Sequence, residues 1–353
     1  MGNLESTGSS GTTVLTGTTV LAGTSRGVFA LDPAHGAEPR SVLESRGVRD
    51  LFGVNDRVFA GTGAGVFVSN DGGATWSASG LADHEVWQVR ATADGAVLYA
   101  GTQPAGLFRS VDSGETWAEI ESFAALPEAA EWCVPLDDPL PGRARALVVD
   151  ADDPDQLWVG VEVGGIAHTT DGGETWSFGQ PGGNPDLHMM WAHPEEDGVL
   201  FASTGYGRAD HIAEEIEGNA GVFRSEDDGR TWNYAWKGIT PRYSRPMCID
   251  VRAPYALTVA SAPTAFSSFK DEGGAHAALF RSFDHGESWS SLCDEAHSPC
   301  DANIHGLIPD PAVPGGVIIG TDTGEVWQVS PDAVWTPVAA GLPAVLSLIV
   351  LDR

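Results

Sequence analysis

SNDGGATW, residues 69–76, is the first of five copies of one octapeptide in this chain. The other copies are SVDSGETW (110–117), TTDGGETW (169–176), SEDDGRTW (225–232) and SFDHGESW (282–289). They share the pattern Ser/Thr-x-Asp-x-Gly-x-Thr/Ser-Trp. A motif that recurs along one chain is the sequence signature of a repeat architecture, in which each copy marks the same point of one structural unit.

The chemistry of the octapeptide predicts a tight hairpin turn. Its Asp side chain can accept hydrogen bonds from nearby backbone N–H groups. Its Gly supplies a positive φ without steric cost. The Trp then starts the next strand and buries a large ring between neighbouring sheets. We therefore predict a structural role for the five aspartates of the motif, which are Asp71, Asp112, Asp171, Asp227 and Asp284.

The sequence around each octapeptide predicts a four-stranded unit. An apolar strand such as GVFVS (65–69) precedes the motif, and a strand ending in Gly-Thr, such as FAGT (59–62), precedes that one. An inner strand such as ALVVD (146–150) comes first, and the strand begun by Trp comes last. A four-stranded sheet repeated around an axis is a β-propeller blade.

Two degenerate units raise the count of blades from five to seven. They lie at 21–33 and 317–335, where the second and third strands remain but the turn motif is lost. The first unit lacks an inner strand, and the chain ends in an unpaired inner strand, VLSLIVL (345–351). Pairing the two closes the ring and removes open sheet edges. We predict an all-β, seven-bladed propeller over residues 13–353, with the Gly/Ser/Thr-rich residues 1–12 as a flexible tail.

The composition argues against several partners. The formal net charge is -30, so the surface repels nucleic acid and anionic membranes. The first 20 residues lack a signal-peptide pattern, and no apolar stretch reaches membrane-spanning length. We therefore expect a cytoplasmic protein with reduced thiols. A bridge between Cys293 and Cys300 stays open, as do the oligomeric state and a saline host as the reason for the acidity.

The octapeptides resemble the Asp-box, or BNR, repeats of the sialidase-like β-propeller superfamily. This resemblance covers roughly residues 13–353 and implies the propeller fold. The superfamily includes sialidases, xyloglucan-degrading glycosidases, sorting receptors and a photosystem II assembly factor, so the fold alone does not imply one activity. The chain also resembles uncharacterised intracellular Asp-box or glycosyl-hydrolase repeat proteins. It lacks the Phe/Tyr-Arg-Ile-Pro segment with which sialidases begin.

The long insertions all fall on one predicted face. Antiparallel connections place the Asp-box turns on one face of the ring. The insertions 118–143, 204–220 and 261–277 then lie on the opposite face. Long connections in a compact fold often serve function. We therefore predict a binding site at the centre of the insertion-bearing face.

The inner strands begin on that same face, so their first residues should surround the axis. Aligning the strands puts seven residues at equivalent positions, namely Asp50, Trp87, Arg145, His188, Cys248, His305 and Ser347. Strand alternation also turns inward the residues two positions earlier, which include Glu85, Arg143, Asp186 and Asn303. Arg245 lies beside Pro246, which interrupts the series. Polar groups that converge on a concave mouth mark the default site.

These residue types indicate roles. Arginines bind an anionic group bidentately, histidines exchange protons near neutral pH, and glycoside hydrolysis uses two carboxylates. The predicted catalytic residues are His188, His305, Asp186, Asp50 and Glu131. The predicted substrate-binding residues are Arg143, Arg145, Arg245, Trp87, Trp132, Asn303 and Tyr206.

Two functions remain open from the sequence. The first is an enzyme, hydrolase-like or lyase-like, that acts on a carbohydrate-like or carboxylated small molecule. It needs no predicted cofactor, and a divalent metal between His188 and His305 stays open because propeller sites combine distant residues. The alternative is a non-catalytic ligand- or protein-binding assembly scaffold. Mutation of the central ring should abolish an enzyme's function, whereas changes in the outer insertions should abolish a scaffold's.

Overall fold

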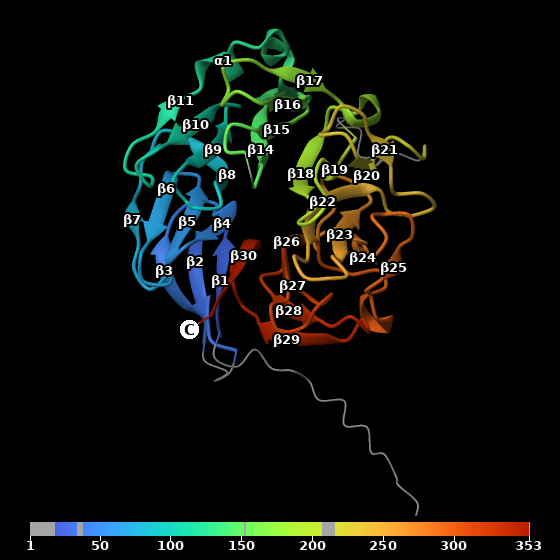
Figure 1. The fold of residues 1–353 in the computed structure, drawn as a ribbon. Coiled ribbons are helices and arrows are strands. Elements are labelled where there is room, and N and C mark those ends of the chain that lie inside the picture. Colours follow the sequence, from blue (N-terminus) through green and yellow to red (C-terminus); the bar gives the residue numbers. More distant parts are fainter. Residues whose placement is uncertain (1–17, 34–37, 152, 207–215, 353) are drawn as a thin grey trace, which may run out of the picture.

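The computed structural model describes residues 18–33, 38–151, 153–206 and 216–352. Seven four-stranded antiparallel sheets surround one axis, which confirms the predicted seven-bladed propeller (Figure 1). The predicted tail, residues 1–12, lies outside the described residues. In each blade one strand lies innermost, and the other three follow it outward.

The first four blades run from the N-terminal region to the middle of the chain. The first blade contains β30 (Val345–Asp352), β1 (Thr18–Thr24), β2 (Gly27–Leu31) and β3 (Arg40–Glu44). The second contains β4 (Asp50–Val54), β5 (Arg57–Thr62), β6 (Gly65–Ser69) and β7 (Ser77–Ala78). The third contains β8 (Glu85–Ala91), β9 (Leu98–Gln103), β10 (Leu107–Ser110) and β11 (Ala118–Glu119). The fourth contains β14 (Arg143–Val149), β15 (Leu157–Glu162), β16 (Gly165–Thr169) and β17 (Ser177–Gly179).

Three further blades complete the ring. The fifth contains β18 (Leu187–Ala192), β19 (Leu200–Thr204), β20 (Gly221–Ser225) and β21 (Asn233–Tyr234). The sixth contains β22 (Tyr243–Ile249), β23 (Leu257–Ala262), β24 (Ala278–Ser282) and β25 (Ser290–Ser291). The seventh contains β26 (Ile304–Pro309), β27 (Val317–Thr321), β28 (Val326–Val329) and β29 (Trp335–Ala339). The insertion between the third and fourth blades carries α1 (Glu121–Ala124), η1 (Pro127–Glu131), β12 (Cys133–Val134) and β13 (Leu140–Pro141).

The ring closes as the sequence predicts. The C-terminal strand β30 pairs with β1 in antiparallel register, from Thr18 opposite Asp352 to Thr24 opposite Val345. Val345 and Leu348 of β30 also pack with Ile318 of the seventh blade in one buried cluster. One strand therefore joins the first blade to the last, and the sheet edge of β1 is covered.

The Asp boxes are hydrogen-bonded turns. In the first box, Asp71 Oδ1 accepts from the N–H groups of Ala74 and Thr75 at 3.0 and 2.9 Å. The Thr75 hydroxyl donates to Asp71 Oδ2 at 2.6 Å. These bonds, led by the Thr75 hydroxyl, lower the pKa of Asp71 to about 2. A hydroxyl two residues earlier and another four residues later donate in the same way to each of the other box aspartates, Asp112, Asp171, Asp227 and Asp284.

Tryptophan side chains link neighbouring blades. Trp117 Nε1 donates to the carbonyl of Ser79 in the preceding blade at 2.6 Å. Trp289 makes the same contact with Ala235 at 2.7 Å, and Trp335 with Leu292 at 2.7 Å. Each ring therefore fills the space between two sheets and also satisfies its polar group there.

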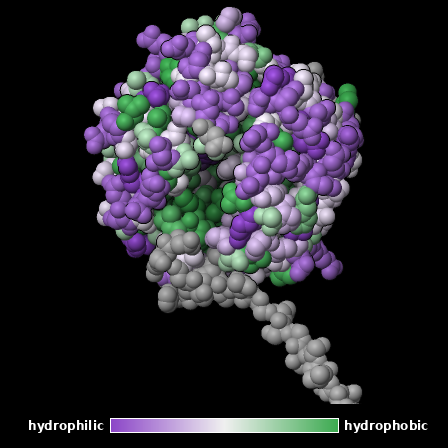
Figure 2. Space-filling model, viewed as in Figure 1, coloured by the Kyte–Doolittle hydropathy of each residue, from purple (hydrophilic) through white to green (hydrophobic). Residues whose placement is uncertain are grey.

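The rim of the molecule is hydrophilic, and a hollow at its centre is bordered by hydrophobic residues on the face in view (Figure 2). All four cysteines are free thiols in the structure, so Cys293 and Cys300 are not bridged. None of the helices in the described part of the chain combines the length and the apolar character needed to cross a membrane.

Ring closure by β30 gives a first prediction. Deleting residues 345–353 should lower the thermal unfolding temperature and broaden the transition, because β1 and the seventh blade lose a shared strand. A synthetic peptide of residues 345–352, added in excess, should restore part of the loss through mass action. Deleting residues 1–12 serves as the control and should leave the transition unchanged. Equal effects of the two deletions would contradict the closure.

Candidate functional site

The same irregularity recurs at the start of the inner strands. In six of the seven blades, the inner strand carries one more residue than its partner strand, close to the point where their pairing begins. Such a β-bulge leaves the extra residue outside the ladder and re-aims its side chain. Pro246 shares the bulge of β22 with Arg245. The bulged residues are Trp87, Arg145, His188, Arg245, His305 and Leu346.

The bulges correct two positions of the sequence alignment. The alignment placed Cys248 and Ser347 at the position of these bulged residues, but both residues are paired within their strand ladders. Cys248 is 1% exposed and belongs to the buried cluster between the sixth and seventh blades. The Ser347 hydroxyl donates to the Val48 carbonyl at 3.0 Å. The residues that take the axial position in these blades are Arg245 and Leu346.

A cavity of about 360 Å³ lies at the centre of the ring, where the inner strands begin. Its wall combines the bulged residues with their neighbours. The lining residues are Arg49, Asp50, Trp87, Gln88, Arg143, Arg145, Glu162, His188, Met189, Arg245, Pro246, His305 and Leu346. A smaller cavity of about 170 Å³ adjoins it and shares Arg143, Glu162 and Arg245 with it. We call the first the central cavity and the second the side cavity.

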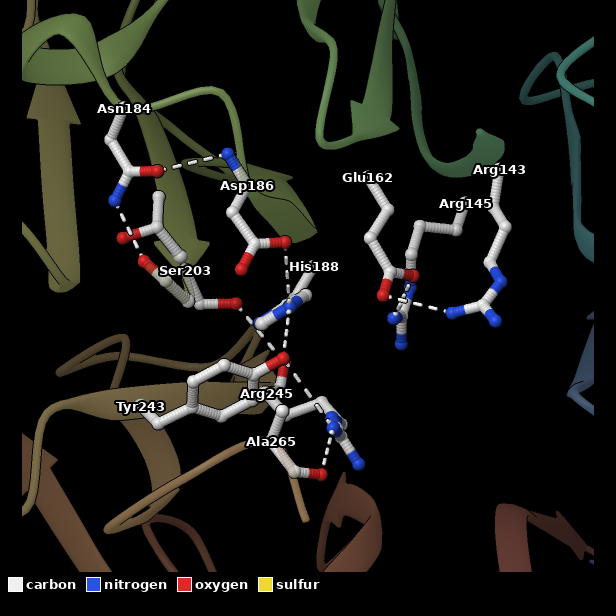
Figure 3. Close-up of polar contacts among 12 residues, drawn as sticks. Arg143, Arg145, Glu162, Asn184, Asp186, His188, Ser203, Tyr243, Arg245 and Ala265 are labelled. Carbon is white, nitrogen blue, oxygen red and sulfur yellow. Dashed lines mark hydrogen bonds and ion pairs between the residues drawn. The ribbon is translucent and has the colours of Figure 1, made fainter. Parts of the chain in front are cut away.

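Arginines dominate the charge of the central cavity. Arg49, Arg143 and Arg145 place their guanidinium carbons 4.4, 4.7 and 4.9 Å from the centre of the Trp87 ring. Such contacts are favourable because the ring face is electronegative. The fourth arginine, Arg245, donates to the Ala265 carbonyl at 3.0 Å (Figure 3).

Glu162 joins two of these arginines. Its Oε1 lies 2.9 Å from Arg143 Nη1, and its Oε2 lies 2.6 Å from Arg145 Nη1 (Figure 3). Burial acts to raise the pKa of Glu162, but Arg145 and then Arg143 lower it well below its usual range. Glu162 is therefore an ionised, buried carboxylate.

Two donors in the wall have no partner. Trp87 Nε1 and Arg245 Nε are buried and have no hydrogen-bond acceptor within the described ranges. Buried polar atoms are nearly always satisfied in folded proteins, by protein, water or ligand. Both atoms belong to residues that line the central cavity, so an acceptor-bearing ligand would satisfy them.

A hydrogen-bonded group connects the two cavities: His188 lines the central cavity, and Asp186 and Tyr243 line the side cavity. His188 Nδ1 donates to the Ser244 carbonyl at 2.7 Å, which leaves Nε2 facing the Tyr243 hydroxyl at 3.1 Å and Asp186 Oδ1 at 3.2 Å (Figure 3). Nε2 accepts the Tyr243 proton when it is neutral and donates to Asp186 when it is protonated. Burial, and then the Asp186 charge, raise the pKa of Tyr243 above its usual range.

Gly205 allows this group to pack. The residue follows β19, and a Cβ atom built on it would clash with Asp186, Tyr243 and His188. Its carbonyl accepts from Asn184 Nδ2 at 2.7 Å, and Asn184 Oδ1 accepts from the Asp186 N–H at 2.9 Å (Figure 3). The Asn184 side chain therefore links the Gly205 carbonyl to the backbone N–H of Asp186 and holds Asp186 in position.

His305 contrasts with His188. It lies in the wall of the central cavity, and burial, followed by the charges of Arg245, Arg145 and Arg49, lowers its pKa to about 3. His305 is therefore a neutral imidazole at physiological pH. It can form hydrogen bonds there, but it cannot supply a proton as an imidazolium.

The structure brings together most of the predicted site residues. Asp186 lines the side cavity. Asp50 lines the central cavity, but its carboxylate accepts from Arg90 and from the Val89 N–H, both at 2.9 Å. The other predicted residues in the wall of the central cavity are Trp87, Arg143, Arg145, His188, Arg245 and His305.

Four predicted site residues line neither the central nor the side cavity, so their placement is corrected. Trp132 is 8% exposed and packs against Phe123 in the core of its own insertion, with ring centres 4.9 Å apart. Glu131, beside it, is exposed to solvent. Asn303 donates to the Ser267 carbonyl at 2.7 Å and so anchors the insertion of the sixth blade. Tyr206 lies next to residues outside the described ranges and is absent from the wall of the cavity.

Sequence reasoning missed Glu162, Arg49 and Tyr243. Glu162 is the last residue of β15, the second strand of its blade. In other blades, this position directly follows the Gly-Thr pair. The end of an antiparallel second strand lies opposite the start of the first, and Glu162 is indeed paired with Arg143. Applying this register to the sequence would have found Glu162. Nothing comparable in the sequence points to Arg49.

The donors that could hold a metal differ from the predicted pair. Glu162, Asp186 and His188 each offer an atom within 4.8 Å of the others, whereas His305 does not belong to this group. Arg143 and Arg145 already neutralise Glu162 and would repel a cation. The neighbouring arginines therefore disfavour a metal at this group.

A second donor group lies outside the cavity and comprises His193, Glu196 and His285. His193 Nδ1 accepts from the N–H groups of Glu195 and Glu196 at 3.2 and 3.0 Å. A neutral imidazole with an accepting Nδ1 carries its proton on Nε2. Nε2 then has no lone pair for a metal, so this group is structural.

Comparison with known proteins agrees with the fold. Residues 67–78 match the model of the BNR/Asp-box repeat. A xyloglucanase of Hypocrea jecorina is 27% identical over 229 residues, which are 64% of this chain and 22% of the xyloglucanase. The chain thus spans about a fifth of the length of that relative.

Solved structures give the same result at lower identity. The GH74 xyloglucanase from Xanthomonas campestris superposes with a TM-score of 0.60 and 15% identity, over 82% of this chain and 45% of that one. An ancestral GH74 enzyme superposes with a TM-score of 0.59 and 11% identity, over 80% and 36%. The chain is therefore an Asp-box β-propeller similar to glycoside hydrolases.

The packing at Gly205 gives a second prediction. Gly205→Ala should lower the free energy of unfolding by about 1–3 kcal/mol, because the added methyl overpacks Asp186, Tyr243 and His188. Gly179→Ala is the matched control, since a Cβ atom there meets nothing within 4 Å. Urea unfolding of both variants checks this. An equal, small effect of both substitutions would contradict the described packing.

The neutral state of His305 gives a third prediction. Its folded-state pKa of about 3 lies below the ordinary value of 6.5, so protonation favours the unfolded chain. The stability that His305 contributes is therefore complete above pH 6.5 and is lost as the pH falls toward 3. Between pH 6.5 and 5, the wild type should lose about 2 kcal/mol more than His305→Gln. Parallel stability curves for the two proteins in urea unfolding would refute a buried neutral His305.

Proposed function

We propose that this propeller is an enzyme that takes a carboxylated, sugar-like small molecule into its central cavity and hydrolyses a bond next to the acidic sugar. The observation that carries the proposal is the convergence of four arginines on one cavity of a chain whose net charge is -30. An acidic protein gains nothing from burying several like charges together unless they bind something, since each buried charge loses hydration.

The geometry of the arginines favours a carboxylate as the bound group. Guanidinium groups bind carboxylates through parallel, charge-assisted hydrogen bonds. Glu162 satisfies one nitrogen each of Arg143 and Arg145. The unpartnered Nε of Arg245 and Nε1 of Trp87 remain for a ligand. We assign the ligand carboxylate to Arg145 and Arg245, because the Arg245 charge is close enough to help lower the pKa of Arg145.

Two carboxylates supply the chemistry in this proposal. Glu162 is held ionised by its arginines and would stabilise the positive charge that develops at the sugar carbon. Asp186, whose Oδ1 lies 3.2 Å from His188 Nε2, would donate a proton to the leaving group. Their nearest oxygens lie within 4.8 Å of each other, close to the spacing of about 5 Å at which glycosidases retain configuration.

The similarity to xyloglucanases supports glycoside chemistry as the reaction class. It does not extend to their substrate, because the arginine-rich cavity suits an acidic rather than a neutral sugar. If the cavity binds an acid without turning it over, the propeller is instead a ligand-binding scaffold.

Paired sugars that differ only in a carboxylate test the proposal. Titration calorimetry should show binding of glucuronate and none of glucose. Arg145→Met should weaken glucuronate binding at least tenfold, because a charge-assisted hydrogen bond is lost from a buried site. Arg230→Met, on an exposed Asp-box turn, is the control and should bind as the wild type does. Equal binding of glucose and glucuronate would contradict the proposal.

Turnover is tested separately with p-nitrophenyl glucuronide. Glu162→Gln and Asp186→Asn should each reduce kcat at least a hundredfold while glucuronate still binds, because each removes a group that acts on the reacting bond. Wild-type protein that binds glucuronate but releases no nitrophenol from this or related acidic glycosides would favour the scaffold.

A further inference from the structure

The central cavity continues along the propeller axis into an apolar space. A third cavity, of about 320 Å³, shares six lining residues with it, namely Arg49, Asp50, Met189, Pro246, His305 and Leu346. The two cavities are therefore neighbouring parts of one axial channel. We call this second part the apolar chamber.

The composition of the wall changes along the channel. The central cavity lies at the first residues of the inner strands, whereas the chamber is lined by residues two to four positions further along. At a rise of about 3.3 Å per residue, the chamber extends roughly 7–13 Å toward the Asp-box face. The chamber's apolar lining includes Phe52, Trp191, Met247, Ile308, Leu348 and Ile349.

The arginines that line the chamber are paired with carboxylates. Arg90 Nη1 lies 2.9 Å from Asp50 Oδ2. The Arg90 guanidinium also covers the rings of Phe52 and Trp191, at 5.3 and 5.7 Å from their centres. The chamber thus presents ring surfaces and aliphatic side chains, and both of its arginines are paired, Arg90 with Asp50 and Arg49 with Glu85. Within the channel, the arginines that do not each have a carboxylate of their own line only the central cavity.

From this polarity we infer that the ligand is amphipathic, with an acidic sugar head among the arginines and an aromatic or short alkyl group in the apolar chamber. The inference rests on the proposed function and narrows its substrate class to acidic glycosides of apolar alcohols or phenols. An apolar group gains free energy in proportion to the surface that leaves water, whereas a polar group there would lose hydrogen bonds to water.

Two glucuronides of different apolar size test the inference. Phenyl β-D-glucuronide should bind the wild type roughly tenfold more tightly than methyl β-D-glucuronide, as expected for burial of a ring. The calorimetric heat-capacity change should also be more negative for the phenyl compound, because more apolar surface is buried.

A matched pair of variants places the effect in the chamber. Phe52→Asn should remove the preference for the phenyl compound while methyl glucuronide still binds, because Phe52 lines only the chamber. Phe67→Asn, at a similarly half-buried phenylalanine of the same blade that lines neither cavity, should keep the preference.

The outcomes separate this inference from the proposed function. Equal affinities and equal heat-capacity changes for the two glucuronides in the wild type would overturn the inference alone. A preference that Phe52→Asn leaves intact would also overturn it. Failure of both glucuronides to bind the wild type would overturn the arginine site and the inference with it. The heat-capacity comparison uses only wild-type protein, so it decides even if a variant does not fold.

Discussion

One extra residue near the start of six of the seven inner strands is the constraint on which the site depends. A regular antiparallel ladder would keep Arg145, His188 and His305 within the alternation of their strands. The bulge takes each of them out of the ladder and turns it toward the axis. Because a propeller repeats its blades around that axis, the same local irregularity in successive blades brings distant residues into one cavity. The first blade repeats the bulge in β30, so ring closure also completes the wall of the cavity.

The electrostatics of the cavity follow from this convergence. Arg143, Arg145 and Arg245 lie near enough that burial and mutual repulsion would be costly without compensation. Glu162 supplies part of that compensation by bridging two of them. The remaining positive charge persists within a molecule of net charge -30. An anion that approaches meets an unfavourable long-range field, so its binding must depend on short-range contacts inside the cavity.

The fold could be predicted from the sequence because the main residues of the Asp box each have a recognisable structural role. Its Asp, Gly and Trp are all needed for one turn and one inter-blade contact, so five copies specify five blades. The site was predictable only in part. The starts of the inner strands identified Arg145, His188 and His305, but a bulge has no clear signature in sequence, and Cys248 and Ser347 were therefore misplaced. Trp132 was misassigned because an insertion can form a small core of its own. Predicting Glu162 requires the pairing register of β14 and β15, which the residue composition does not give.

A crystal structure of the protein with bound glucuronate tests the central claim most directly. The account predicts that the carboxylate lies between Arg145 and Arg245, accepts hydrogen bonds from Arg245 Nε and Trp87 Nε1, and leaves Glu162 paired with Arg143. The sugar ring should then lie beside Glu162 and Asp186. Glucuronate bound outside the ring of bulged residues, or a saturating soak that leaves both donors without an acceptor, would contradict it.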